Sequence, residues 1–475
     1  MKKLTILLFI QIVCITGFIQ FANAINFEDY FETKTMRVDY FHSGNAEEEH
    51  FSIDRVLNDG EWAGSQKYLF DNLNLGLYFF EVQDLESSTV LFNRGFASIF
   101  GEWQSIPEAE EKWGTFHESV RFPWPLKPVK LIMKKRDAEN QFVKIWETEI
   151  DPTARSVNPA EHLSSFNVFS YLKSGSPTEK VDIVILGDGY TVDEMEKYQN
   201  DVKRLAAELF AVEPFKSQKN DFNVSAIETP SEVSGVNRPH PGVFKRTALS
   251  TSYSSFDSER YVLAYDNRTI RDVAATVPYD YMFILINEET YGGGGIFRLY
   301  STVAVDNSFS DYIFVHEFGH SFAGLADEYY TSSVSYEMGE VTMEPYEYNI
   351  TALLDPDNLK WKHLVDKSTP LPTPWEKEPY DNFSYEIQKE RKALRAAKVP
   401  EAEVEALFER EKKESAVILD NMEYTGKVGA FEGGGYMQYG LYRPYADCIM
   451  FTRNKQQFCP VCQDAISKVI DQYTK

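Results

Sequence analysis

The chain has 475 residues, of which 43% are hydrophobic and 15% aromatic. A chain of this length and composition can bury a substantial core, so it is not disordered, and it is long enough for two or more domains. Its formal net charge is −25 at pH 7, and a phosphate backbone repels such an acidic surface. We therefore expect no nucleic acid among its partners.

The first 24 residues have the composition of a secretory signal peptide. Lys2 and Lys3 precede an apolar stretch, and the small residues Ala22 and Ala24 form a typical cleavage site. We predict cleavage after Ala24 and a mature protein that is secreted, periplasmic or held at the cell surface. A membrane anchor is the alternative, but two glutamines interrupt the apolar stretch. No later segment is long and apolar enough to be expected to span a bilayer.

Residues 25–173 are predicted to form an all-β, sandwich-like N-terminal domain. Short apolar runs alternate with turn residues, as in MRVDYF, GLYFFEV and STVLF. Residues 129–150 contain two extended runs joined by a polar turn, which indicates a long β-hairpin. The polar segment SGSPTEK at 174–180 marks the expected domain boundary.

From residue 174 to 475 the pattern of a strand followed by a helix predicts an α/β or an α+β fold, of which we expect α+β. The apolar run VDIVILGDGY is typical of a buried strand, and the helix after it starts with Thr191 and Glu194 spaced as a capping box. YDYMFILINEE and LYSTVAVDN are predicted strands on either side of a flexible loop at 292–295. A charged helical insertion is expected near 384–415 as a surface hairpin, with a partner-binding coiled coil as the alternative.

The segment VHEFGHSFAGLADEYY at 315–330 carries the strongest functional signal. His316 and His320 are four residues apart, so on a helix both imidazoles lie on one face and can bind one metal ion. Glu317 lies beside that face, where it can act as a general base without being a ligand. A chance match inside a core helix is the alternative, but the two strands expected before the helix favour a metal site.

The third metal ligand depends on where this helix ends. Gly324 can adopt the left-handed conformation that stops a helix, so the chain can turn back and bring Asp327 within reach of the metal. Glu328 is the neighbouring alternative. In a second geometry the ligand comes from a later helix, and Glu340 or Glu344 would supply it.

Several motifs in the same order resemble those of one peptidase family. HEFGHSFAGLADEY, DCIMF around Met450, FCPVC and the earlier VDIVILGDGYT are similar to the igalysins, the IgA-peptidase-type bacterial metzincins. The resemblance implies a metzincin-like catalytic domain, with a mixed sheet, a zinc-binding helix and a methionine turn beneath the metal. It also implies Zn²⁺ as the cofactor, held by His316, His320 and Asp327.

The chain departs from the standard metzincin zinc motif at two positions. That motif has glycine at its eighth position and histidine at its eleventh, where this chain has Ala323 and Ala326. Gly324 and Asp327 each come one residue later, so the aspartate would take the place of the histidine. By the same resemblance, the strand around 299–305 would form the upper rim of the substrate cleft.

Cys448, Cys459 and Cys462 lie close together near the C-terminus. For an oxidising compartment we predict a disulfide from Cys448 to one of the other two, which would stiffen the segment around Met450. A structural zinc site is disfavoured because a fourth cysteine is missing. A redox pair is disfavoured because the surrounding pattern is not thioredoxin-like.

Together these features predict a secreted zinc-dependent endopeptidase. Glu317 would take a proton from the water that attacks a peptide carbonyl. The candidates for stabilising the oxyanion are Tyr436, Tyr439, Tyr442 and Tyr445. The substrate is expected to be a protein or peptide, and the resemblance suggests immunoglobulin A or another host glycoprotein. The alternative is a non-catalytic surface binding module in which zinc is structural.

Overall fold

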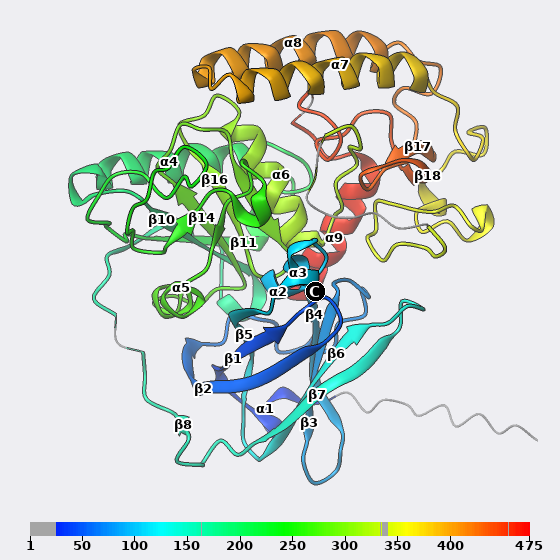
Figure 1. Ribbon diagram of the computed structural model, residues 1–475. Coiled ribbons are helices and arrows are strands. Elements are labelled where there is room, and N and C mark those ends of the chain that lie inside the picture. The colour runs from blue at the N-terminus through cyan, green and yellow to red at the C-terminus, as the bar shows by residue number, and fades with distance from the viewer. Residues whose placement is uncertain (1–24, 163, 333, 335–340, 455) are drawn as a thin grey trace, which may run out of the picture.

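The computed structural model describes residues 25–162, 164–332, 334, 341–454 and 456–475. The chain has a β-rich N-terminal part and a larger part built around a six-stranded sheet (Figure 1). The predicted signal peptide, residues 1–24, lies outside the described residues. Across the described ranges, no helix combines the length and the apolar character needed to cross a membrane.

Two four-stranded sheets form the N-terminal part, with the orders β5-β1-β2-β8 and β4-β3-β6-β7. The first contains β1 (Phe31–Gly44), β2 (Glu49–Glu61), β5 (Gly114–Pro125) and β8 (Val157–Asn158). The second contains β3 (Tyr78–Asp84), β4 (Val90–Phe96), β6 (Val129–Arg136) and β7 (Phe142–Ile150). Alternate residues such as Val38, Tyr40 and Val82 share one core, because alternate side chains of a strand point to opposite faces. The N-terminal part is therefore built from β structure as predicted, and β6 and β7 form the expected hairpin.

The larger part contains one mixed sheet with the order β15-β16-β14-β10-β11-β9. Its strands are β9 (Val168–Leu172), β10 (Val181–Asp188), β11 (Phe222–Ile227), β14 (Tyr281–Ile286), β15 (Gly293–Ile296) and β16 (Tyr300–Ala304). The four inner strands are parallel, and the edge strands β9 and β15 are antiparallel to their neighbours. Since β9 belongs to this sheet, the sheet starts before the boundary expected at 174.

Helices cover both faces of this sheet. The helices that pack against the sheet are α2 (Ile99–Trp103), α4 (Met195–Leu209), α5 (Asn267–Ala274), α6 (Ser310–Ala323) and α9 (Pro460–Thr474). Ile183 and Ile185 of β10 share a core with α4, α6 and α9. Val184 and Leu186 point to the other face and pack with α5 and α2. Because α2 comes from the N-terminal part, the two parts share a core.

The expected helical hairpin is present, and it starts earlier than predicted. It consists of α7 (Lys377–Ala396) and α8 (Glu401–Leu419), which lie side by side at the opposite end of the molecule from the N-terminal sheets (Figure 1). Besides short 3₁₀ turns, the other α-helices and strands of the described residues are α1 (Phe27–Tyr30), α3 (Glu108–Glu111), β12 (Thr251–Ser252), β13 (Leu263–Ala264), β17 (Phe431–Gly434) and β18 (Met437–Arg443). The hairpin β17–β18 leads directly into the segment that contains the cysteines.

Candidate metal and catalytic site

Helix α6 carries the HExxH motif and ends at a glycine. Gly324 has φ +58° and ψ +33°, the left-handed conformation, and its N–H bonds to the carbonyl of His320 at 2.9 Å. Glycine adopts this conformation without the steric penalty that other residues meet. The chain therefore turns back after α6, as predicted, and returns beneath the histidines.

The turn brings three predicted metal ligands together. The Nε2 atoms of His316 and His320 are 3.1 Å apart, and they lie 3.1 and 3.3 Å from Oδ1 of Asp327. His316 and Asp327 are buried, while the side chain of His320 remains 15% exposed. Two residues four apart on a helix and one residue beyond its end thus form a single group.

Backbone carbonyls fix the orientation of both imidazoles. Nδ1 of His316 lies 2.9 Å from the carbonyl oxygen of Ile449, and Nδ1 of His320 lies 2.6 Å from that of Leu325. A carbonyl can only accept a hydrogen bond, so each Nδ1 carries a proton. In the neutral ring, Nε2 is then free to act as a ligand, an arrangement typical of histidines that bind metals.

The two oxygens of Asp327 have different surroundings. Oδ2 accepts a hydrogen bond from the Tyr436 hydroxyl at 2.5 Å. Oδ1 is buried and faces the two histidines, and it has no hydrogen-bond donor other than their Nε2 atoms. A buried carboxylate oxygen needs a donor or a cation to offset the cost of its burial. Two imidazole nitrogens and one carboxylate oxygen match the ligand set that zinc takes in catalytic sites, so the residues fit this ion.

The charges of the site depend on one another. Burial tends to raise the pKa of Asp327, but the two histidines outweigh it and hold that pKa well below its usual value. Burial tends to lower the pKa of His320, but Asp327 outweighs it and raises that pKa to about 9. Asp327 is therefore ionised at neutral pH, and in the metal-free site His320 is protonated, so a bound metal would displace the proton from its Nε2. Burial also raises the pKa of Glu317, whose side chain lies at the edge of the same group.

The other candidates for the third ligand lie elsewhere or are not described. Glu328 follows Asp327 in the chain, but its Oε1 lies 2.9 Å from Asn349 Nδ2 and 3.5 Å from Cys462 Sγ. Glu344 accepts hydrogen bonds from Thr351 and from two backbone amides. Glu340 lies outside the described residues.

Met450 lies directly against α6, the helix that carries the HExxH motif. A Cβ added to Gly319, between the two histidines, would be 3.0 Å from the Met450 sulfur. The Met450 carbonyl accepts a hydrogen bond from the backbone N–H of Glu328 at 2.8 Å. Met450 is fully buried, so the segment that contains it forms a packed floor beneath α6.

The predicted disulfide is wrong in this structure. Cys448, Cys459 and Cys462 are free thiols, and Cys462 Sγ lies 3.9 Å from Cys448 Sγ and 3.5 Å from Cys459 Sγ. Sulfurs joined in a disulfide are about 2.0 Å apart. The prediction came from counting cysteines, whereas the fold brings all three together with the carboxylate of Glu328.

A cavity of about 560 Å³ opens onto the predicted ligands and Glu317.

The prediction that the strand around 299–305 forms the upper rim of the substrate cleft is wrong. Strand β16 is hydrogen-bonded to β14 on one side and to β15 on the other, so β15 is the edge strand of the sheet. The loop expected at 292–295 is wrong as well, because backbone pairing with β16 makes Gly293–Ile296 a strand. A Cβ at Gly295 would lie 2.3 Å from the Glu317 carbonyl oxygen. Glycine thus allows β15 to lie close against α6.

Other residues near the ligands had little or no signal in the sequence. Tyr329 is a hydrogen-bond neighbour of Asp327, and Arg260 donates to the Tyr329 hydroxyl at 3.2 Å. Of the four candidate tyrosines, Tyr436 contacts Asp327, whereas Tyr439 is 62% exposed. The position of Tyr329 beside the motif was a weak clue. Nothing in the local sequence singles out Arg260, which comes from a distant segment.

Comparisons with known proteins identify the family. The family model described as IgA Peptidase M64 matches residues 169–470, and the model described as Peptidase M64 N-terminus matches residues 26–147. No curated protein matches the chain. The first match spans well over half of the chain, and the second covers most of the N-terminal β structure. The chain therefore belongs to the IgA peptidase M64 family, as its resemblance to the igalysins predicted, and it is a peptidase by family.

Proposed function

We propose that the protein is an exported zinc-dependent endopeptidase of the metzincin type. We assign His316, His320 and Asp327 as the zinc ligands and Glu317 as the catalytic base. The observation that carries this proposal is the convergence of two Nε2 atoms, whose rings are held by backbone carbonyls, on the buried Oδ1 of Asp327. The floor at Met450 supports the metzincin assignment.

The residues of the chain have distinct roles in this mechanism. When bound, zinc would act as a Lewis acid that polarises the scissile carbonyl and lowers the pKa of water. Glu317 accepts a proton from the attacking water and later delivers it to the leaving amine. Burial raises the pKa of this carboxyl. Tyr436 holds Asp327 in place through Oδ2.

The accessibility of the group supports a catalytic rather than a structural metal. His320 and Glu317 are partly exposed and border the cavity, so a substrate carbonyl can approach them. A structural zinc site is normally closed by four protein ligands. Here three ligands converge at the side of an open cavity, which argues against a binding module with structural zinc.

The family description names immunoglobulin A, and we propose secreted glycoproteins of this kind as the substrate class. This proposal agrees with export by a cleaved signal peptide. The acidic chain and its peptidase family also agree with a protein or peptide partner rather than nucleic acid.

The decisive experiment compares the purified mature protein with its Glu317→Gln and His320→Ala variants on a denatured protein substrate. We expect hydrolysis by the native protein, loss of activity on zinc removal and recovery on adding zinc back. His320→Ala should lose the zinc from this site, whereas Glu317→Gln should retain it. If hydrolysis continues undiminished in both variants, the catalytic assignment is wrong.

A further inference from the structure

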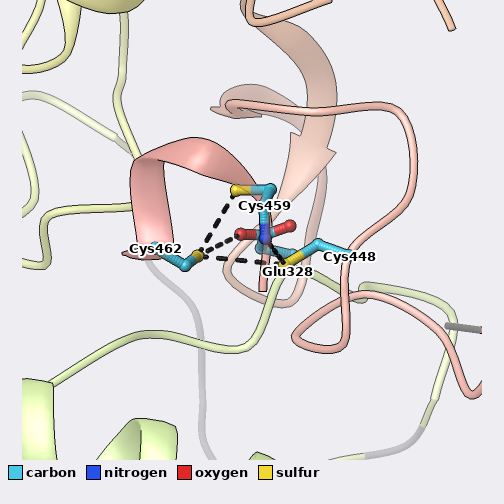
Figure 2. Close-up of side chains that lie close together, drawn as sticks. All are labelled: Glu328, Cys448, Cys459 and Cys462. Carbon is cyan, nitrogen blue, oxygen red and sulfur yellow. Dashed lines mark hydrogen bonds between the residues drawn. The ribbon is translucent and has the colours of Figure 1, made fainter. Parts of the chain in front are cut away.

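A second group of potential metal ligands lies outside the cavity. Cys448, Cys459, Cys462 and Glu328 each offer one atom, and these four atoms lie within 4.8 Å of one another. Figure 2 shows the three sulfurs and the carboxylate converging, with Cys462 linked to the other three residues. None of the four lines the cavity beside His316. The group is therefore separate from the site assigned to catalysis.

The distances in this group match a tetrahedral zinc site. With Zn–S bonds of about 2.3 Å, two sulfurs at the corners of a tetrahedron are about 3.8 Å apart, and a sulfur and an oxygen about 3.5 Å. The measured Sγ–Sγ distances from Cys462 are 3.5 and 3.9 Å. Its distance to Oε1 of Glu328 is 3.5 Å. All three separations fit around one ion of this size.

Three segments supply the four side chains. Cys459 is the N-cap residue of α9, and Cys462 lies in the first turn of that helix, so a Cys-x-x-Cys spacing turns both sulfurs the same way. Cys448 comes from the floor beneath α6, and the backbone N–H of Cys459 points at its sulfur at 3.3 Å. Glu328 comes from the segment just after Asp327. A helix N-terminus also favours negatively charged sulfur, as zinc binding requires.

Burial leaves the carboxylate of Glu328 incompletely satisfied. The four residues are at most 4% exposed, and Glu328 is fully buried. Oε1 accepts a hydrogen bond from Asn349, but Oε2 is buried without a partner. A carboxylate in such a place is costly unless a cation or a donor compensates it. A bound cation would provide that compensation.

We propose that Cys448, Cys459, Cys462 and Glu328 bind a second, structural zinc ion. Soft thiolate ligands select zinc over magnesium or calcium, and four protein ligands leave no open position for a substrate. Binding releases the thiol protons to solvent as each sulfur becomes a thiolate. Glu328 takes the place of the fourth cysteine whose absence disfavoured such a site in the sequence.

This second ion would hold together the parts that build the catalytic site. Glu328 adjoins Asp327, and Cys448 is one residue before Ile449, whose carbonyl orients His316. The hydrogen bond from the Glu328 amide to the Met450 carbonyl already links these two segments. Zinc at the cysteine site would therefore lock the third ligand and the floor in one arrangement.

Metal counting on the mature protein, expressed with zinc, tests this proposal directly. We expect two zinc ions per chain in the native protein by native mass spectrometry and elemental analysis. His320→Ala should retain one ion, and Cys462→Ser should lose the other. Asp464→Asn is the matched control, because it removes a carboxylate on the same helix, outside the group, and should leave both ions bound. Cobalt substitution of His320→Ala should give a sulfur-to-cobalt charge-transfer band, which a histidine–carboxylate site cannot produce.

The native protein and His320→Ala keep the proposal testable even if the cysteine variants do not fold. A native chain whose mass is lower by two hydrogens, with no second zinc, would mean that two of the thiols form a disulfide instead. Loss of all zinc in His320→Ala would also overturn the proposal. If the native protein binds a single zinc ion and His320→Ala still binds it, the result would support the cysteine site and contradict the proposed catalytic metal.

Discussion

The Tyr436 hydroxyl donates a hydrogen bond to Oδ2 of Asp327 at 2.5 Å, and the other oxygen of that carboxylate faces the two histidines. The tyrosine thus determines which oxygen is presented to a metal. Partners of this kind hold a ligand in place before the ion arrives.

Replacing Tyr436 with phenylalanine should weaken zinc binding, because Asp327 loses the donor that orients it. We expect the zinc affinity at the histidine site to fall by about 10- to 100-fold, the range found for such partners. Competition with a chelator measures this effect. Tyr439→Phe is the control, since Tyr439 is largely exposed and should leave the affinity unchanged. Equal affinity in the two variants would show that Tyr436 does not position the ligand.

Glu317→Gln should keep the fold and the zinc and lose peptidase activity. The amide has nearly the same shape but cannot accept the proton of the attacking water, and general bases contribute about 10²- to 10⁴-fold. Turnover of a denatured protein, measured beside zinc content, checks both expectations. Near-native turnover with zinc bound would rule out Glu317 as the base.

Met450→Leu should cost only about 1 kcal/mol of stability, because the change conserves volume, and zinc content should stay nearly unchanged. Gly319→Ala is the contrasting variant, since its Cβ would lie 3.0 Å from the Met450 sulfur and 2.9 Å from the Phe458 ring. We expect overpacking there to cost about 1–3 kcal/mol. Thermal unfolding and elemental analysis of both variants check the packing of this floor. Loss of zinc in Met450→Leu would contradict a role limited to packing.

The stability of the N-terminal sheets should depend on pH through His42, which lies between Glu118 at 3.0 Å and Glu49 at 2.8 Å. Burial tends to lower the pKa of His42, but the two glutamates outweigh it and raise that pKa above its usual value. The contribution of this histidine is therefore complete below about pH 6.5 and is lost as the pH rises through the folded-state pKa.

Replacing His42 with glutamine should thus lower the unfolding temperature most at acidic pH, and the difference from the native protein should shrink towards pH 9. Breaking a buried pair by removing one partner costs about 3–5 kcal/mol. Calorimetry at several pH values measures the effect. His50→Gln is the control, because the side chain of His50 is 62% exposed. A difference that grows with pH would have the wrong sign for this pair.

The mature protein should begin at Ile25. That residue packs against the edge of the N-terminal core, so cleavage after Ala24 would place a residue in contact with this core at the new terminus. N-terminal sequencing of the exported protein checks the cut. Cytosolic protein with residues 1–24 intact would contradict export.

The sequence by itself determined the features that depend on local geometry. The four-residue spacing of His316 and His320 places them on one face of any helix, and Gly324 stops that helix in any surroundings that permit a left-handed residue. Apolar periodicity likewise predicted the β-rich N-terminal part, the strand at β10 and the paired helices α7 and α8. These patterns are readable because the interactions that produce them lie within a few residues of each other.

Only the tertiary structure decided which of two adjacent carboxylates faces the histidines and which faces the cysteines. Asp327 turns to the histidines and Glu328 to the cysteines, because neighbouring side chains outside a helix point in different directions and each meets a different distant segment. The same holds for the three cysteines, because Glu328, the fourth member of their group, lies 120 residues or more away along the chain. Strand pairing placed β15 at the sheet edge against α6. Such contacts between distant segments depend on how the whole chain packs, and local sequence does not record them.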